Sequence, residues 1–318
     1  MIRLCITAIA ALLVAVPAAA AQPTKLVVFG DSLVDAGNIN AAVGSDVFNP
    51  VARGYFPGRF TNGPDYTDLL NRRLFGSLLT PSLLGGSNFA FGGARIANDG
   101  DRVPDLALQL GAYFASSGGT ADPAALYIIN AGGNDVFGLQ SGNLGGFADA
   151  DAYVASLLDT LAGSVQALSA RGAQRILVTG IPNLNAVGFG VEALVQARLS
   201  AIEPGLGSTQ LLRFSYLSFF QQLGADPAAF GLPPFTQAGN CIDNRVPVNG
   251  RIDCTGFFSF DGIHPTAAVH QALYREVGAL TGISAVPEAQ EWVMLVMGFG
   301  MVGAVMRRRN AVGQGQLH

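Results

Sequence analysis

Residues 25–38 read KLVVFGDSLVDAGN, in which a short apolar run ends at Phe29 and is followed at once by a Gly-Asp-Ser turn. An apolar run bounded by a proline before it and a tight turn after it is typical of a buried strand. Similar runs occur at residues 125–129 (ALYII) and 175–178 (RILV). We therefore predict three buried strands, the first of which ends in a turn that carries a serine.

A helical pattern lies between the second and the third of these runs. From about residue 151 to residue 170, apolar side chains recur on one helical face, at Tyr153, Leu157, Leu158, Leu161, Val165 and Leu168. A second helix is expected after residues 264–266 and continues to about residue 280. Strands that alternate with such helices predict an α/β fold with helices on both faces of a parallel sheet. Ligands bind beyond the carboxyl ends of the strands in such folds, so the residues after each strand are the functional candidates.

The composition fits one sizeable globular domain with additional terminal signals. The chain has 318 residues, of which 50% are hydrophobic and 13% are charged, and its formal net charge is −4. These values exclude a disordered or fibrous protein, and they leave no basic surface for a phosphate backbone. Nucleic acid is therefore not expected as a partner.

The first 21 residues have the layout of a secretory signal peptide. Arg3 precedes an apolar run over residues 4–16, and three alanines at residues 19–21 end the segment. We predict cleavage after Ala21 and a single catalytic domain over residues 22–280. The alternative is a buried first helix.

Two cysteines, Cys241 and Cys254, remain after the predicted cleavage. In a chain that reaches an oxidising compartment, such a pair is expected to form a disulfide. Metal binding is the alternative, although the spacing lacks the second close pair or the histidines that zinc sites use. No metal site is expected in this sequence.

Ser32 stands immediately after the first predicted strand, where a sheet presents side chains to a pocket. A lone serine in a turn is usually only a turn residue, and the Gly-x-Ser-x-Gly motif of nucleophile elbows is absent. A histidine base must come from His264, His270 or the terminal His318. Asp261 precedes His264 by three residues, so its carboxylate can hold one ring nitrogen while the other faces the serine. His270 is expected to be an ordinary packed or solvated helix residue.

Four separated segments resemble, in order, the conserved blocks of GDSL-type SGNH hydrolases. They are residues 29–38 (FGDSLVDAGN), 88–94 (NFAFGGA), 132–135 (GGND) and 261–266 (DGIHPT). The resemblance extends over residues 25–280, and two further segments resemble the secreted lipase, lysophospholipase and autotransporter-esterase branch: residues 58–64 (GRFTNGP) and 225–231 (ADPAAFG). It implies a three-layer α/β/α hydrolase of the flavodoxin-like type.

The resemblance also implies a role for each matching residue. Ser32 would be the nucleophile, His264 the general base and then acid, and Asp261 the residue that orients His264. The oxyanion hole would be formed by three donors: the Ser32 backbone N–H, the side-chain amide of Asn134, and the backbone N–H of Gly93 rather than of the glycine before it. A glycine allows close approach of the substrate, and an amide donates without a titrating charge. No cofactor is implied.

Other residues near the motifs are expected to support this site. Three are expected to cap and hold the nucleophile turn: Asp31, Asp35 and Asn38. Three are expected to shape the pocket without acting as catalysts: Arg59, Asn62 and Asp135. Five phenylalanines near the motifs favour an acyl chain in the substrate: Phe56, Phe60, Phe89, Phe91 and Phe137.

The composition changes again near the C-terminal end. Residues 281–291 are predicted to be a linker with a PEP-like motif, residues 292–309 a hydrophobic sorting or anchor segment with an arginine cluster, and residues 310–318 a tail. The apolar part, from Trp292 to Met306, would span about 22 Å as a helix, which is shorter than a hydrocarbon core of roughly 30 Å. The arginines that follow it predict a transient contact with the inner membrane.

This tail resembles the PEP-CTERM sorting signal of exopolysaccharide-producing Gram-negative bacteria. The resemblance rests on Val286-Pro287-Glu288, the apolar stretch and the arginines. It implies an exosortase-type processing partner and a mature protein that is exported through the inner membrane to the cell surface, the matrix or the medium. A permanent anchor, a degenerate tail and a buried core helix are the alternatives.

The sequence thus predicts a secreted serine hydrolase that cleaves carboxylic esters of lipids or of short to medium acyl groups. Acid or thioester chemistry and polysaccharide O-deacetylation on the same triad are the enzymatic alternatives. A non-catalytic matrix or surface protein of the same fold is the alternative from another class, but the five positions expected to react all carry competent residues.

Overall fold

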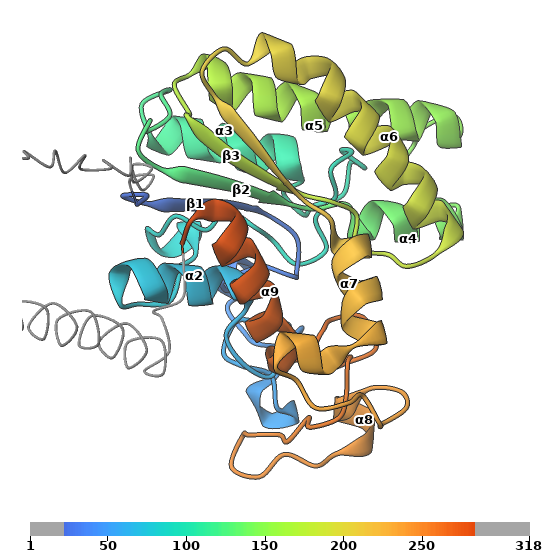
Figure 1. Cartoon of the computed structure of the whole chain (residues 1–318). Coiled ribbons are helices and arrows are strands. Elements are labelled where there is room, and N and C mark those ends of the chain that lie inside the picture. The colour runs from blue at the N-terminus through green and yellow to red at the C-terminus, as the bar shows by residue number, and fades with distance from the viewer. Residues whose placement is uncertain (1–21, 284–318) are drawn as a thin grey trace, which may run out of the picture.

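A computed structural model of the chain describes residues 22–283 and contains a four-stranded parallel sheet (Figure 1). The strands lie in the order of the sequence: β1 (Leu26–Gly30), β2 (Leu126–Asn130), β3 (Arg175–Thr179) and β4 (Gln210–Phe214). The three predicted strands are confirmed to within one residue, whereas β4 was not predicted. No helix within the described range is long and apolar enough to cross a bilayer.

A short segment over residues 88–91, called the Asn88 segment below, extends this sheet along the edge of β1 that does not pair with β2. Val28 forms a parallel bridge with Asn88, and the Phe89 and Phe91 N–H groups donate to the Val28 and Gly30 carbonyls. After β1, the chain first forms the Asn88 segment along one edge of β1. It then crosses over and forms β2 along the opposite edge of β1, as in flavodoxin-like sheets. This change of direction opens a crevice at the carboxyl end of β1, where Ser32 lies.

Helices cover both faces of the sheet. The α-helices are α1 (Asn38–Val43), α2 (Tyr66–Phe75), α3 (Leu106–Ser116), α4 (Gly133–Ser141), α5 (Ala150–Ala170), α6 (Ala186–Ile202), α7 (Tyr216–Ala225), α8 (Cys241–Asn244) and α9 (Ala267–Thr281). Short 3₁₀ turns are η1 (Val51–Arg53), η2 (Ser82–Leu84), η3 (Glu203–Gly205) and η4 (Pro227–Phe230). The two helices predicted from periodicity correspond to α5 and α9.

Alternate residues of each strand belong to two separate apolar cores. Val27 and Phe29 of β1 pack with α3, α5 and α6, while Leu26 and Val28 pack with α2, α7 and α9. Figure 1 shows α3, α5 and α6 on one side of the sheet and α2, α7 and α9 on the other. Successive side chains of a strand point to opposite faces, so a fully apolar strand requires cover on both. The predicted three-layer α/β/α architecture is confirmed.

A third apolar cluster surrounds the disulfide. Cys241 and Cys254 are bonded, with their Cα atoms 5.4 Å apart, and they pack with Tyr55, Phe257 and Phe260. The predicted disulfide is therefore confirmed. It lies in the loop region around α8, below the sheet in Figure 1.

The predicted terminal segments lie outside the described residues. These are the signal peptide over residues 1–21, the linker from residue 284 onward, the apolar segment 292–309 and the tail 310–318. The helix α9 continues to Thr281, the first residue of the predicted linker.

Candidate active site

The nucleophile turn begins at Gly30, the last residue of β1. A Cβ atom on Gly30 would lie 2.0 Å from the backbone oxygen of Asn130, so β1 and β2 approach too closely here for any other residue. The Gln109 side chain fixes both backbone groups of Gly30, since it accepts from the N–H and donates to the carbonyl, each at 2.8 Å. Ser32 therefore follows a rigid strand end.

Ser32 and His264 meet although 232 positions separate them. The Nε2 atom of His264 lies 2.7 Å from Ser32 Oγ, and its Nδ1 atom lies 2.7 Å from Asp261 Oδ2. A proton on Nδ1 that is donated to the carboxylate leaves the Nε2 lone pair for the serine hydroxyl. The arrangement can therefore transfer the Ser32 proton to His264.

The backbone of the turn holds Asp261 in place. Its Oδ1 atom accepts from the N–H groups of Ile263 at 3.0 Å and His264 at 2.8 Å, which leaves Oδ2 for the ring. Burial acts to raise the pKa of Asp261, but the hydrogen bonds and charge of His264 outweigh burial and lower it. Asp261 is therefore ionised at neutral pH and can stabilise an imidazolium.

Asp31 is a second carboxyl group next to the nucleophile. It is buried, and its Oδ1 atom accepts from the Leu33 N–H at 3.0 Å, which holds the turn as predicted. Burial raises the pKa of Asp31 to about 7, against the opposing effects of this hydrogen bond and of His264. Asp31 thus supports the turn at the edge of the cavity.

Asp35 connects the nucleophile turn to the segment that contains Gly92 and Gly93. Its Oδ1 atom accepts from the N–H groups of Gly37 and Asn38, each at 2.7 Å, and its Oδ2 atom accepts from Gly92 at 2.8 Å. Asn38 in turn donates to two carbonyls of the Asn88 segment. The capping role predicted for Asp35 is confirmed, whereas the Asn38 side chain holds the Asn88 segment and does not cap the nucleophile turn. The N–H of Gly92 is used by Asp35, so it is not free for an oxyanion.

The residues directly before and after Gly93 are each held by a hydrogen bond. The Gly92 N–H before it is bound by Asp35, and the Ala94 carbonyl after it accepts from Asn134 Nδ2 at 2.9 Å. Gly93 is exposed and has a φ of +88°, a conformation that favours glycine. Within residues 22–283, no hydrogen bond engages its N–H. Gly93 is not among the residues that line the cavity described next.

A cavity of about 210 Å³ lies beside Ser32. Its polar lining includes Ser32, His264 and Asn134, and its apolar lining consists of Leu33, Phe137, Pro182, Leu184, Phe220, Phe258, Ile263 and Pro265. One Asn134 N–H is donated to Ala94, so the second N–H of the amide remains for a ligand. The cavity therefore combines a potential nucleophile, a base and a donor with apolar walls.

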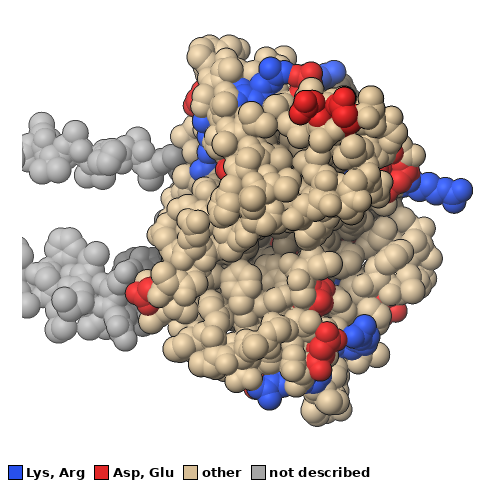
Figure 2. Space-filling model, turned by 90° about the vertical axis from the view of Figure 1, so that its right-hand side faces the viewer, with Lys and Arg blue, Asp and Glu red and all other residues tan. Residues whose placement is uncertain are grey.

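Three apolar side chains at this cavity are exposed: Phe137 is 42%, Leu184 48% and Ile263 65% accessible. They come from α4, the loop before α6 and the loop before α9. Figure 2 shows the face of the molecule that lies on the right of Figure 1, where α4, α6 and α7 are seen. Charged side chains gather mainly near the upper and lower borders of this face, and few lie around its hollowed middle.

Of the five phenylalanines near the motifs that were expected to favour an acyl chain, four do not line the cavity. Only Phe137 lines the cavity. Phe89 and Phe91 are buried, the Phe56 ring lies beneath the Arg59 guanidinium, and Phe60 packs on His264 with 5.1 Å between ring centroids. Most of the apolar lining comes instead from segments outside the motifs, because the folded chain brings the starts of α6 and α7 to the same edge of the sheet.

The expectation that Arg59, Asn62 and Asp135 shape the pocket is also wrong, because none of them lines it. Arg59 forms a buried two-pronged ion pair with Asp68 at 2.7 and 2.8 Å. Asn62 accepts from the Ala267 N–H at the start of α9, and Asp135 accepts from the N–H groups of Ile96 and Ala97. They hold the backbone behind the site.

Of two residues beside the catalytic histidine candidate, Tyr55 was missed, and Phe60 was expected near the site but not on the imidazole. Tyr55 donates to Asp261 Oδ2 at 3.0 Å, and the Phe60 ring covers one face of the imidazole. No sequence signal joins Tyr55 to Asp261, which lies 206 positions later. His270, by contrast, is a packed helix residue as expected, and its Nδ1 atom accepts from the Tyr66 N–H.

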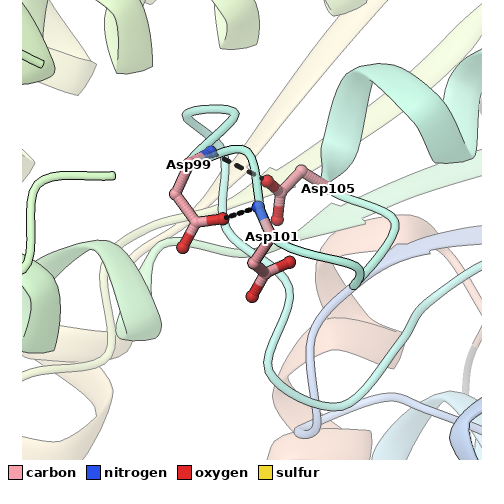
Figure 3. A group of neighbouring side chains, drawn as sticks. All are labelled: Asp99, Asp101 and Asp105. Atoms are coloured by element: carbon pink, nitrogen blue, oxygen red, sulfur yellow. Dashed lines mark hydrogen bonds between the residues drawn. The ribbon is translucent and has the colours of Figure 1, made fainter. Parts of the chain in front are cut away.

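A group of three aspartates is the described cluster with metal-like spacing. The carboxylates of Asp99, Asp101 and Asp105 lie within 4.8 Å of one another, in the loop before α3 (Figure 3). Asp99 accepts from the Asp101 N–H and pairs with Arg95 at 3.2 Å, and Asp105 accepts from the Arg95 and Asp99 N–H groups. These contacts stabilise the loop before α3, and they account for the close spacing of the three aspartates.

Comparisons with known proteins agree on one family. A family model described as GDSL-like Lipase/Acylhydrolase matches residues 26–277. "Lipase 1" of Photorhabdus luminescens is 32% identical over 160 residues, which cover 50% of this chain and 22% of that protein. A "GDSL esterase/lipase" of Arabidopsis thaliana is 27% identical over 184 residues, which cover 51% of this chain and 50% of that protein. The chain thus spans half or less of the length of these two relatives.

One solved structure with a similar arrangement is LAE5, described as an alpha/beta hydrolase enzyme from the metagenome of Lake Arreo in Spain. It has a TM-score of 0.45 and 16% sequence identity, and the match covers 84% of this chain and 98% of that one.

Proposed function

Because the chain belongs to the GDSL-like lipase/acylhydrolase family, we propose that it hydrolyses carboxylic esters through an acyl-enzyme on Ser32. The observation that carries this proposal is the hydrogen-bonded series Ser32, His264 and Asp261 at the edge of a cavity. A serine that touches a base, itself oriented by a carboxylate, is the arrangement that activates a hydroxyl as a nucleophile.

The reaction proceeds in two half-reactions. His264 Nε2 takes the Ser32 proton as Oγ attacks the ester carbonyl, and the imidazolium is stabilised by Asp261. The tetrahedral intermediate then collapses, the carbon–oxygen bond to the alcohol breaks, and His264 protonates the departing alcohol. In the second half, His264 takes a proton from water, the resulting oxygen attacks the acyl-enzyme, and Ser32 regains its proton as the acid leaves.

The oxyanion is stabilised by the Ser32 N–H, the Gly93 N–H and the Asn134 amide. Two contacts support Gly93 as the donor rather than Gly92: Asp35 occupies the Gly92 N–H, and Asn134 binds the Ala94 carbonyl. Fixed donors aimed at the developing charge lower the barrier because they need no reorganisation during the reaction.

The substrate is an ester with an apolar acyl group. The predominantly apolar walls of the cavity and its exposed rim of Phe137, Leu184 and Ile263 support this choice over a polysaccharide O-acetyl ester. A sugar substrate needs many hydrogen-bonding partners, whereas burial of methylene groups on apolar walls is favourable by about 0.8 kcal/mol each.

The test is a panel of p-nitrophenyl esters of increasing acyl length beside an acetylated polysaccharide. We expect higher kcat/KM for medium chains than for acetate, and covalent labelling of Ser32 by a fluorophosphonate. The Ser32→Ala variant should lose both turnover and labelling, while the exposed Ser208→Ala variant should retain both. Turnover by Ser32→Ala would overturn the mechanism, and a preference for the polysaccharide would assign the deacetylase alternative. Absence of any turnover and of labelling would favour a non-catalytic surface protein.

Export and tail processing are proposed together with this activity. They rest on the signal-peptide layout of residues 1–21 and on the PEP-CTERM-like segment 286–309, with an exosortase-type enzyme as the processing partner. Mass spectrometry of the protein recovered from outside the inner membrane should give an N-terminus at Gln22 and a loss of the apolar segment. An intact C-terminal end would contradict tail removal.

A further inference from the structure

A tyrosine hydroxyl is attached to the carboxylate that orients His264. The Tyr55 hydroxyl donates to Asp261 Oδ2 at 3.0 Å, and the same oxygen accepts from His264 Nδ1 at 2.7 Å. The other carboxylate oxygen is bound by two backbone N–H groups. Asp261 therefore has four hydrogen-bond donors, of which Tyr55 is the single side chain from a distant part of the described chain.

The disulfide cluster holds Tyr55 in this position. Its ring packs edge-on against Phe260 with 4.8 Å between centroids, in the cluster that contains Cys241 and Cys254. The N–H groups of Cys241 and Ile242 donate to the Ser259 and Phe260 carbonyls, directly before Asp261. The disulfide-bonded segment thus supports both ends of the hydrogen bond between Tyr55 and Asp261.

The phenol is suited to act as a permanent donor. Burial and the charge of Asp261 raise the pKa of Tyr55, so its proton remains in place at every pH at which the site works. The other charged groups that affect Tyr55 are Arg53 and Asp243, which face each other at 3.8 Å and are largely exposed. Neither of them competes for the carboxylate.

We propose that Tyr55 is a positioning residue of the hydrolase, which fixes the Asp261 carboxylate for His264 and moderates its pull on the imidazole proton. The proposal rests on the proposed serine-hydrolase function. Since Tyr55 shares the charge of Oδ2, its hydroxyl weakens the attraction of the carboxylate for the Nδ1 proton. Loss of the hydroxyl should make His264 more basic and its orientation less fixed.

The test is the Tyr55→Phe variant, which keeps the ring against Phe260 and removes only the hydroxyl. On a water-soluble p-nitrophenyl ester we expect kcat to fall by about tenfold with KM nearly unchanged. We also expect the acid limb of the kcat/KM profile to move to higher pH, because the imidazolium is held more strongly. A proton NMR signal from the His264 Nδ1 hydrogen should move with it, and this measurement does not depend on turnover.

The matched control is Tyr113→Phe, which removes another buried hydroxyl that contacts Tyr127 and not the triad. It should keep wild-type kinetics and the wild-type pH profile. An unchanged kcat and acid limb in Tyr55→Phe would overturn the proposal, as would equal changes in Tyr113→Phe. Failure of the serine mechanism is distinguishable, because it would appear as turnover that persists in Ser32→Ala.

Discussion

The His264 imidazole lies between Ser32 and Asp261, with a nitrogen atom 2.7 Å from each side chain. This contact joins the carboxyl end of β1 to the turn before α9, which are the first and last regular elements of the described domain. The sheet fixes one partner, and the packing of α9 against α2 and the sheet fixes the other. The distance between Ser32 and His264 therefore depends on the assembly of the whole domain, whereas the distance between His264 and Asp261 is set within one turn.

Asp261→Asn should reduce kcat by about 10³- to 10⁴-fold. An amide that donates to Nδ1 places the imidazole proton on Nε2, where it cannot accept the Ser32 proton. Stopped assays on a soluble ester, with thermal unfolding to verify the fold, measure this effect. A loss below tenfold would show that Asp261 does not set the tautomer.

Asn134→Ala should reduce kcat by about 10²- to 10³-fold with a small change in KM, because the amide binds charge that develops only in the transition state. Asn143→Ala, an exposed asparagine just after the same helix, is the control and should have normal kinetics. Equal activity of the two variants would remove Asn134 from the oxyanion hole.

Gly30→Ala should destabilise the protein by about 3 kcal/mol or more, since the added methyl would overlap the Asn130 carbonyl of β2. Gly163→Ala is expected to have the opposite effect on stability. It lies on the exposed side of α5 with nothing within 4 Å of its added Cβ, and should stabilise the fold by about 0.5–1 kcal/mol. Denaturant unfolding compares the two. A tolerated alanine at residue 30 would contradict the close approach of β1 and β2.

His270 should make the protein acid-sensitive. Burial, assisted by the charge of His264, lowers the pKa of His270 to about 3 from a usual value near 6.5. As the pH falls below about 6.5, the unfolded chain takes up a proton that the folded chain does not. The free energy of unfolding therefore decreases with falling pH, at up to about 1.4 kcal/mol per pH unit from this group, until about pH 3.

His270→Gln tests this dependence because its amide does not titrate. Unfolding free energies of the wild type and the variant should differ most at neutral pH and converge as the pH is lowered towards 4. A constant difference between the two proteins over this range would mean that His270 has the same pKa in the folded and the unfolded protein, which would contradict the prediction.

Secondary-structure elements whose pattern depends on their own residues alone could be predicted from the sequence. The run before Ser32 predicted β1 because four consecutive apolar residues need cover on both faces, and the spacing from Tyr153 to Leu168 predicted α5. The strand β4 was missed because Arg213 interrupts its apolar run, and two of its five residues are only partly buried. Because β4 lies at the edge of the sheet, next to β3, fewer of its side chains are buried and fewer of them need to be apolar.

The amino-acid sequence by itself predicted the candidate reacting groups, Ser32, Asp261, His264, Gly93 and Asn134, because they stand in short segments that can be recognised without the fold. Only the tertiary structure decided what surrounds them. Tyr55 reaches Asp261, Phe60 covers His264, and Phe220 lines the cavity through contacts between distant segments. Such contacts depend on how helices pack on the sheet, and packing follows from the shape of the whole core rather than from any local pattern.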